Sequence, residues 1–149
     1  MLTARQSIDL PPVWLALFAG LVWLSGAVFE PEPVGLLRAT GFLAIAAGGV
    51  LMLLAIVEFR RHRTTVIPHQ TATSLVTSGV YRASRNPIYL ADALILAGLC
   101  LIWSPVGLIL VPAFMALITH RFIKPEEARL RAAFGDAFDD WSARTRRWL

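Results

Sequence analysis

Charged residues are scarce in this sequence of 149 residues. Asp, Glu, Lys and Arg together make up 16% of the chain, against roughly a quarter in ordinary soluble domains, and hydrophobic residues make up 56%. The mean hydropathy of +0.62 agrees with this composition. An ordinary soluble domain is therefore excluded, and the sequence predicts an integral membrane protein that forms one compact unit.

Cysteine is almost absent, and the residues that usually bind metals are scattered. Cys100 lies in an apolar run, so the chain has no disulfide framework, and its three histidines lack the spacing of metal ligands. The net charge of +4 is compatible with nucleic-acid binding, but no basic helix with interleaved aromatic residues lies outside the apolar runs. In membrane proteins, basic residues more often mark cytoplasmic loops and contact anionic lipids. We therefore expect membrane lipids as partners, no nucleic acid and no metal site.

Four apolar runs hold most of the hydrophobic residues, at positions 11–29, 39–57, 88–103 and 106–119. The first two are free of charge over about 19 residues each, which is enough to cross a hydrocarbon layer of about 30 Å. Ser104-Pro105 separates the last two, so we expect two short helices in a tight hairpin.

Small residues recur along the second run, at Gly41, Ala44, Gly48 and Gly49. Such residues allow a second helix to approach closely in a lipid environment. Glycine is also tolerated in membrane helices without any such contact. Both interpretations of this run remain open at the level of sequence.

The last part of the chain, from Lys124 onward, is charged and has a helical pattern. Leu130, Phe134, Phe138 and Trp141 recur at three- and four-residue spacing, and charged residues occupy the other faces. A glycine at position 135 weakens the middle of this stretch. We expect one amphipathic helix that lies among the lipid head groups.

The longest polar run, His69 to Tyr89, separates the second and third apolar runs. It contains no Asp or Glu, carries Arg82 and Arg85, and is rich in Ser and Thr. Backbone groups and uncharged side chains of this kind can bind a zwitterionic ligand. We interpret the run as a cofactor-binding segment at the membrane edge. The alternative is that Tyr81 and Tyr89 are interfacial aromatic residues and the arginines are positive-inside charges.

The distribution of charge predicts the topology. Glu30 and Glu32 make the connection after the first apolar run acidic, whereas most Lys and Arg residues lie near the polar run and in the C-terminal tail. The positive-inside rule then places both termini and the polar run in the cytoplasm. We expect an all-α membrane protein with about four transmembrane helices, a cytoplasmic cofactor-binding loop and a C-terminal amphipathic helix, located in the inner membrane of a bacterium.

Two stretches carry a resemblance to a known superfamily. They read LVTSGVYRASRNPIYL and PEEARLRAAFGDAFDDWSARTRRWL. The order of G-x-Y, R-(H/N)-P-x-Y, a hydrophobic hairpin, E-E and F-G with a following aromatic residue resembles the isoprenylcysteine carboxyl methyltransferase and phospholipid methyltransferase superfamily of membrane enzymes, over residues 65–148. Asn86 stands where many members have His, and Trp141 stands where Tyr is usual.

The resemblance implies S-adenosylmethionine as the cofactor and indicates which residues form the site. The positions that match those wrapping the cofactor in the family are Thr73, Ser74, Leu75, Val76, Tyr81, Asn86, Pro87, Ile88 and Tyr89. Glu126 and Glu127 match an acidic pair, and Arg121 or Lys124 lies near a basic position associated with the substrate. We take Arg121, Glu126 and Glu127 as catalytic candidates.

The residue types suit this cofactor. Arg85 can pair with a carboxylate, and Glu126 or Glu127 can bind an ammonium group. Tyr81 and Tyr89 offer aromatic faces to adenine or to the sulfonium cation, worth about 0.5–2 kcal/mol. Which glutamate binds the cofactor is open from sequence alone.

The acceptor is also open. A carboxylate or thiolate needs no strong base, whereas an amine must lose a proton, for which Glu126, Glu127 and Asp92 are candidates. Asp92 lies just inside the third apolar run, where it either faces a cavity or sits at head-group depth.

The expected function is methyl transfer from S-adenosylmethionine to a lipophilic or amphipathic acceptor, such as an isoprenylcysteine carboxylate, a phospholipid amine or a thiol. We treat residues 1–149 as a single methyltransferase-like domain, with a two-helix membrane anchor in residues 1–60 and a catalytic core in residues 61–149. The alternatives are an NADPH-dependent membrane reductase related to sterol reductases and a non-enzymatic four-helix scaffold.

Overall fold

The computed structural model describes residues 10–29, 35–63 and 73–149, and within these ranges it contains helices and no strand. The helices are α2 (Pro11–Phe29), α3 (Gly35–Arg61), α4 (Pro87–Trp103), α5 (Leu110–Ile118), α6 (Lys124–Phe134) and α7 (Asp136–Arg144). Two short 3₁₀ helices, η1 (Gly79–Arg82) and η2 (Pro105–Ile109), and a π-helical turn, η3 (Thr119–Ile123), complete the described elements. The expected all-α fold is confirmed.

Among the described residues, three helical stretches are long and apolar enough to cross a membrane: Pro11–Val28, Gly35–Arg61 and Pro105–Phe134. α4 is apolar but has only 17 residues. Large hydrophobic side chains on α2 and α3, such as Trp23 and Leu43, point outward. Because this apolar surface suits lipid rather than water, the chain is an integral membrane protein.

Glycines bring α3 and α4 into close contact. A Cβ atom at Gly41 would lie 2.7 Å from the carbonyl oxygen of Gly98, and one at Gly98 would lie 2.6 Å from that of Gly41. Gly48 approaches the carbonyl of Ala91 in the same way, at 2.9 Å. A Cβ atom at Gly49 meets nothing within 4 Å. Of the two interpretations left open by the sequence, close helix approach therefore holds at Gly41 and Gly48, whereas Gly49 makes no such contact.

The pair Gly41 and Gly49 provides a matched test of this contact. Gly41→Ala and Gly49→Ala gain the same helix propensity, up to about 1 kcal/mol. Gly41→Ala alone pushes a methyl group into the backbone of α4 and should destabilise the protein by about 1–3 kcal/mol. We expect a lower thermal midpoint in detergent for Gly41→Ala and an unchanged or higher one for Gly49→Ala. Equal midpoints would mean that the two helices can separate without cost.

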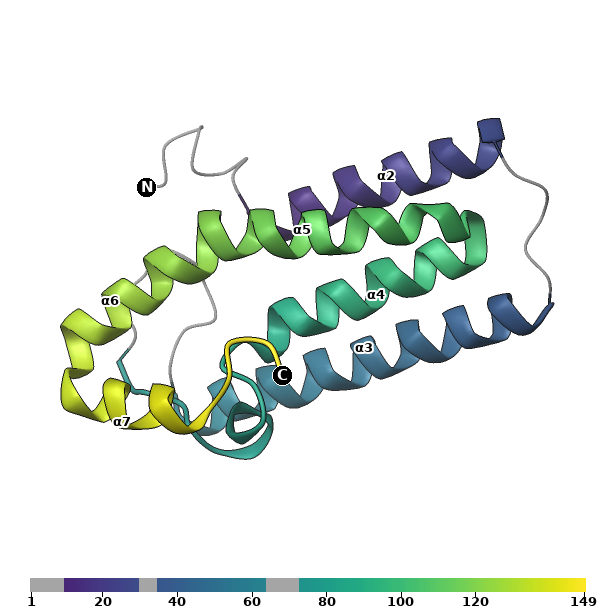
Figure 1. Cartoon of the computed structure of the whole chain (residues 1–149). Helices are drawn as coiled ribbons and strands as arrows, with labels where there is room; N and C mark the ends of the chain where they lie inside the picture. Colours follow the sequence, from purple (N-terminus) through teal and green to yellow (C-terminus); the bar gives the residue numbers. More distant parts are fainter. Residues whose placement is uncertain (1–9, 30–34, 64–72) are drawn as a thin grey trace.

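The hairpin between α4 and α5 forms where the sequence predicts it. α4 ends at Trp103, and the chain turns through Ser104 and the 3₁₀ helix η2. α5 then continues through the π-helical turn η3 directly into α6, so one uninterrupted helical stretch leaves the bundle (Figure 1). A π turn inserts an extra residue into an α-helix and is often found at functional sites.

The single C-terminal amphipathic helix expected from the sequence is wrong. Gly135 has φ of 51° and ψ of −126°, a conformation that L-residues with a side chain rarely adopt, and it ends α6 at Phe134. α7 then folds back instead of continuing along the membrane surface. The predicted apolar face nevertheless exists, because Leu130, Phe134, Phe138 and Trp141 all join one hydrophobic cluster after the reversal.

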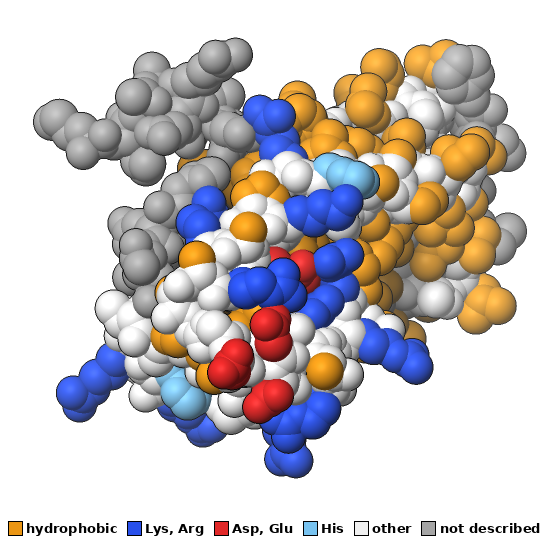
Figure 2. All heavy atoms as spheres, turned by 60° about the vertical axis from the view of Figure 1, so that its left-hand side comes forward, with side chains coloured by type: hydrophobic (Ala, Val, Ile, Leu, Met, Phe, Trp, Pro, Cys, Tyr) orange, Lys and Arg blue, Asp and Glu red, His pale blue; other side chains and the backbone are white. Residues whose placement is uncertain are grey.

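Two hydrophobic clusters hold the molecule together. The bundle cluster consists of Val22, Tyr89, Ala93, Leu96, Cys100, Phe114, Ile118, Phe122 and Ile123. The end cluster consists of Ala55, Val76, Tyr81, Phe138 and Trp141. Figure 2 shows charged side chains gathered over the end formed by α6 and α7, with hydrophobic side chains covering the bundle beyond. The end cluster therefore belongs to the polar end of the protein.

Candidate active site

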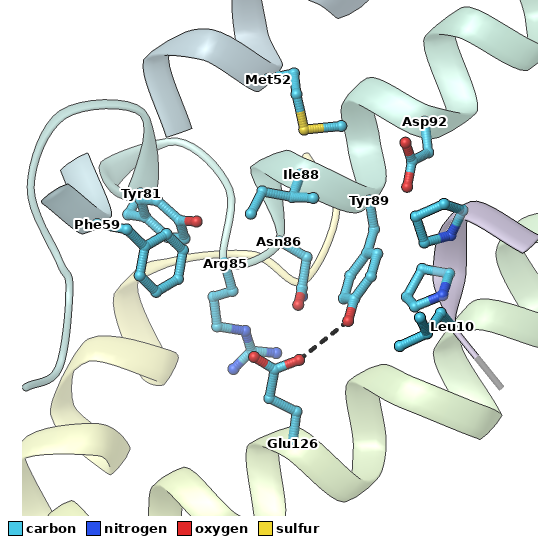
Figure 3. A pocket seen from close by; sticks show the side chains of 12 residues that line it. Leu10, Met52, Phe59, Tyr81, Arg85, Asn86, Ile88, Tyr89, Asp92 and Glu126 are labelled. Atoms are coloured by element: carbon cyan, nitrogen blue, oxygen red, sulfur yellow. Dashed lines mark hydrogen bonds between the residues drawn. The ribbon is translucent and has the colours of Figure 1, made fainter. Parts of the chain in front are cut away.

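A cavity of about 430 Å³ opens at the polar end of the bundle, a volume within the range of roughly 300–1,000 Å³ common for small-molecule sites. It lies where the bundle cluster, through Tyr89, meets the end cluster, through Tyr81 (Figure 3). Its described lining consists of Leu10, Pro11, Pro12, Met52, Phe59, Tyr81, Arg85, Asn86, Ile88, Tyr89, Asp92 and Glu126. We call this space the site cavity.

The start of α4 supplies one wall of the site cavity. Asn86 occupies the N-cap position without a side-chain capping hydrogen bond, and Pro87 occupies the first turn, where the missing N–H is not needed. This start places Ile88, Tyr89 and Asp92 along the cavity side of α4. The hydroxyl of Tyr89 donates a hydrogen bond to Oε2 of Glu126 on α6, at 3.2 Å. The R-N-P-x-Y unit and the first glutamate of the acidic pair therefore meet in one place.

The short helix η1 places Tyr81 on the opposite side. Its ring packs edge to face against Phe59 of α3, with ring centres 5.4 Å apart. The indole of Trp141 donates a hydrogen bond to the carbonyl of Tyr81 at 3.2 Å. Burial raises the pKa of the Tyr81 phenol, so at neutral pH this ring is an uncharged aromatic surface beside the cavity.

A buried carboxylate on α3 anchors the loop before η1. Ser78 donates a hydrogen bond to Glu58 at 2.5 Å, and Arg61 donates another at 3.1 Å. Gly79 has a φ of 55°, and a Cβ atom there would lie 2.6 Å from the same carboxylate. The sequence reasoning missed Glu58, although the glycine of G-x-Y is the signal that could have revealed a crowded turn.

The structure separates the roles of the two adjacent glutamates. Glu126 lines the site cavity, whereas Glu127 is held by two arginines. Arg147 binds Glu127 with both ends of its guanidinium fork, Nε to Oε1 at 3.0 Å and Nη2 to Oε2 at 2.6 Å. These hydrogen bonds raise the pKa of Arg147. Arg85 approaches the same carboxylate at 3.3 Å. Glu127 therefore already has two cationic partners.

Arg85 has one N–H group, at Nε, that no described residue accepts a hydrogen bond from. Its Nη1 donates to the carbonyl of Ser142 at 3.2 Å, and its Nη2 lies beside Glu127. Its Nε is buried and has no hydrogen-bond acceptor among the described residues. Burial lowers the pKa of the Arg85 guanidinium, with Glu127 acting in the opposite direction. A buried donor without an acceptor costs about 1–3 kcal/mol, which favours an anionic ligand beside it.

The last residues of the chain cross over the R-N-P unit. We call residues 145–148 the C-terminal strap. The side-chain amide of Asn86 donates to the carbonyl of Arg147 at 2.9 Å, and the backbone N–H of Arg85 donates to the carbonyl of Arg146 at 2.9 Å. The indole of Trp148 donates to Thr119 at 3.3 Å. The basic residues of this tail predict a contact with lipid head groups, and no local pattern in the sequence reveals that it folds onto the site.

Two adjacent arginines in the strap allow a matched test. Arg147→Ala removes the fork on Glu127, whereas Arg146→Ala removes an exposed side chain and keeps its backbone contact. A hydrogen bond to a charged group is worth roughly 1.5–3 kcal/mol, so Arg147→Ala should reduce stability by about that amount. Arg146→Ala should stay within about 0.5 kcal/mol of wild type. Thermal midpoints in detergent measure both. Equal losses would show that the strap is held by its backbone alone.

Several predicted site residues lie away from the described cavity lining. Thr73 and Ser74 donate side-chain hydrogen bonds to the carbonyls of Arg63 and His62 at the end of α3. Leu75 and Val76 pack in or against the end cluster. Arg121 is exposed in the π turn, with its guanidinium 5.5 Å from the ring centre of Trp14. The first part of the polar run, residues 69–72, lies outside the described residues.

These observations define a helical membrane protein with a largely apolar cavity, lined also by a few polar side chains, at one end of its bundle. Comparison with protein families matches residues 36–137 to the phospholipid methyltransferase family. This match covers more than half of the chain, so the chain belongs to that family. Comparisons with curated proteins and with solved structures gave no match. The matched range contains all of the described cavity lining except Leu10, Pro11 and Pro12.

Proposed function

We propose that the protein transfers a methyl group from S-adenosylmethionine to a lipophilic or amphipathic acceptor at the cytoplasmic face of the membrane. The family is one of phospholipid methyltransferases, which supports methyl transfer to a lipid-like substrate. The proposal rests on one main observation. The residues that match the methyltransferase family, 36–137, include all of the described lining of the site cavity except Leu10, Pro11 and Pro12. A reductase or a non-enzymatic scaffold would give no reason for a methyltransferase family match to include the lining of the cavity.

The residues of the site cavity fit this cofactor. Its ammonium group would bind Glu126, and its carboxylate would accept a hydrogen bond from the buried Nε of Arg85. The rings of Tyr81 and Tyr89 would offer faces to the adenine and the sulfonium. When bound, the sulfonium supplies an activated methyl group, and the protein contributes chiefly by aligning donor and acceptor.

The remaining site residues would act by holding these groups in place. Glu127 fixes the guanidinium of Arg85 through their ion pair, and the C-terminal strap fixes Asn86. Residues 73–76 connect the loop to the end of α3 and to the end cluster. Arg121 lies outside the described cavity lining, on the outer surface of the π turn, where it can meet an acceptor's anionic group at the membrane surface.

The two sides of the site cavity differ in polarity, which suggests how donor and acceptor enter. Arg85 and Glu126 line the side toward α6, whereas Leu10, Pro11 and Met52 contribute apolar lining from α3 and the start of α2. We propose that the cofactor enters from the cytoplasm on the polar side. The acceptor would enter from the bilayer along the apolar lining. The positive-inside rule supports this orientation, because basic side chains gather at the polar end.

Incubation of the purified protein with methyl-labelled S-adenosylmethionine and a lipid extract tests the proposal. We expect label to appear in the fraction extracted into organic solvent, together with release of S-adenosylhomocysteine. The matched control is the same mixture with the Glu126→Gln variant, which should incorporate much less label. Consumption of NADPH without incorporation of label would support the reductase, and the absence of both reactions would support the scaffold.

A further inference from the structure

Glu58, near the end of α3, is a buried carboxylate that lies outside the described lining of the site cavity. Both of its oxygens accept hydrogen bonds, Oε2 from the hydroxyl of Ser78 at 2.5 Å and Oε1 from Arg61 at 3.1 Å. Nε2 of His62 lies 2.8 Å from the same hydroxyl oxygen. Burying a charge is costly unless it is paired and hydrogen-bonded. These contacts meet that condition, and they also tie the polar run to the end of α3.

The turn after Ser78 is shaped around this carboxylate. Gly79 has a φ of 55°, in the left-handed region that favours glycine. A Cβ atom there would lie 2.6 Å from the carboxylate, so the backbone itself lies against Glu58. The backbone N–H of Tyr81 donates to the carbonyl of Ser78 at 3.0 Å, which closes the turn. The contact with Glu58 therefore fixes the point at which the chain enters η1, two residues before Tyr81.

Tyr81 is the residue that this turn presents to the site cavity. Its ring lines the cavity and packs edge to face against Phe59, the residue that follows Glu58 in α3 (Figure 3). Two neighbouring residues of one helix thus act together, since Glu58 holds the turn and Phe59 holds the ring. α3 packs closely on α4 through Gly41 and Gly48. The ring is therefore held in place relative to the wall of the cavity that α4 supplies.

We propose that Glu58 is a positioning residue of the site, which fixes the ring of Tyr81 at the cavity wall by holding Ser78 and the turn at Gly79. The inference rests on the proposed function, in which this ring offers an aromatic face to the cofactor. An aromatic face attracts a cation or stacks on another ring only within a limited range of distance and angle. A mobile ring would also lose conformational freedom when the ligand binds, which weakens binding. Glu58 thus acts on cofactor affinity through Tyr81, without touching the cofactor.

The position of the ring can be measured without any ligand. The sequence has two tyrosines, so protein labelled with 3-fluorotyrosine gives fluorine signals from two rings, and Tyr89→Phe identifies those of Tyr81. Ser78→Ala removes the hydroxyl that reaches Glu58, and its Tyr81 signal should move toward that of free fluorotyrosine. Ser78→Thr keeps a hydroxyl and should restore the wild-type signal, and Thr77→Ala is the control at an exposed neighbour. An unchanged Tyr81 signal in Ser78→Ala would overturn the inference.

Affinity for S-adenosylhomocysteine then tests whether the position of the ring matters to the ligand. Ser78→Ala and Glu58→Gln should each bind it about 10-fold more weakly than wild type or Thr77→Ala, the size of one lost aromatic contact. Titration well below the thermal midpoints ensures that the protein is folded. In a Tyr81→Leu background, Ser78→Ala should cause no further loss, because changes that act through one group are not additive. The same loss in that background would overturn the inference, since it would not depend on Tyr81.

A role in stability alone predicts a different pattern. Ser78→Ala would then lower the thermal midpoint without ligand, while the folded protein would keep the wild-type affinity, and this result would overturn the inference. If the Tyr81 signal moves and the affinity does not change, the cofactor does not use this ring, which overturns the inference but leaves the proposed function intact. If wild type does not bind S-adenosylhomocysteine, the proposed function fails, and the role of the ring toward the cofactor fails with it.

Discussion

Trp141→Ala should cost the protein about 3–5 kcal/mol of unfolding free energy, the usual loss for truncating a large aromatic residue in a core. Trp141 is 7% exposed and packs edge to face with Phe138, with ring centres 5.9 Å apart. Its indole also holds the carbonyl of Tyr81. The end cluster lies at the polar end of the protein, so its side chains are buried from water rather than from lipid. Removing the indole therefore loses the free energy of burying an apolar group from water and leaves a cavity.

Two further tryptophan variants isolate the causes of that loss. Trp141→Phe keeps most of the packing and loses the hydrogen bond to Tyr81, so it should cost about 1 kcal/mol. Trp23→Ala removes a side chain that is 58% exposed on α2 and should have little effect. Denaturant titration in detergent measures all three free energies. If Trp141→Ala behaves like Trp23→Ala, α7 does not support the loop that carries Tyr81.

Glu126→Gln and Glu127→Gln should separate cofactor binding from stability. Glu126 lines the site cavity, and in our proposal it binds the ammonium of the cofactor. Loss of a hydrogen bond to a charged group costs roughly 1.5–3 kcal/mol, so Glu126→Gln should bind S-adenosylhomocysteine about 10- to 100-fold more weakly. Because Glu126 also accepts the hydrogen bond from Tyr89, the thermal midpoint of Glu126→Gln without ligand should fall somewhat, but by less than that of Glu127→Gln.

Glu127→Gln should show the opposite behaviour. This change leaves Arg85 and Arg147 without their shared carboxylate, so it should lower the thermal midpoint without ligand. Calorimetric titration and thermal scans on both variants provide the comparison. If Glu127→Gln loses affinity while Glu126→Gln keeps it, our assignment of the two residues is reversed.

The sequence predicts the helices well because hydrophobic runs and prolines act locally. The range predicted for the first helix, residues 11–29, is that of α2, and Ser104-Pro105 ends α4 as expected. The continuity of α5 with α6 and the reversal at Gly135 were not predicted. The fold-back depends on contacts of Trp141 with η1, about 60 residues earlier in the chain, and no helical period encodes them.

The sequence predicts only part of the candidate site. The short motif R-N-P-x-Y places Asn86 and Tyr89 beside the cavity, since both belong to the start of one helix. The distinct environments of Glu126 and Glu127 depend on Arg147, which lies 20 residues further along the chain. The apolar lining from Leu10 and Met52 depends on helix packing across the whole bundle. Both arrangements join residues that are far apart in the chain, so no short sequence pattern predicts them.

The measurement that tests the central claim most directly is calorimetric titration of the purified protein with S-adenosylhomocysteine and, in parallel, with NADPH. We predict saturable binding of S-adenosylhomocysteine at one site per chain, and no binding of NADPH. Binding of NADPH without binding of S-adenosylhomocysteine would contradict the claim and favour a reductase. Binding of neither ligand to folded protein would leave the site cavity without its proposed cofactor.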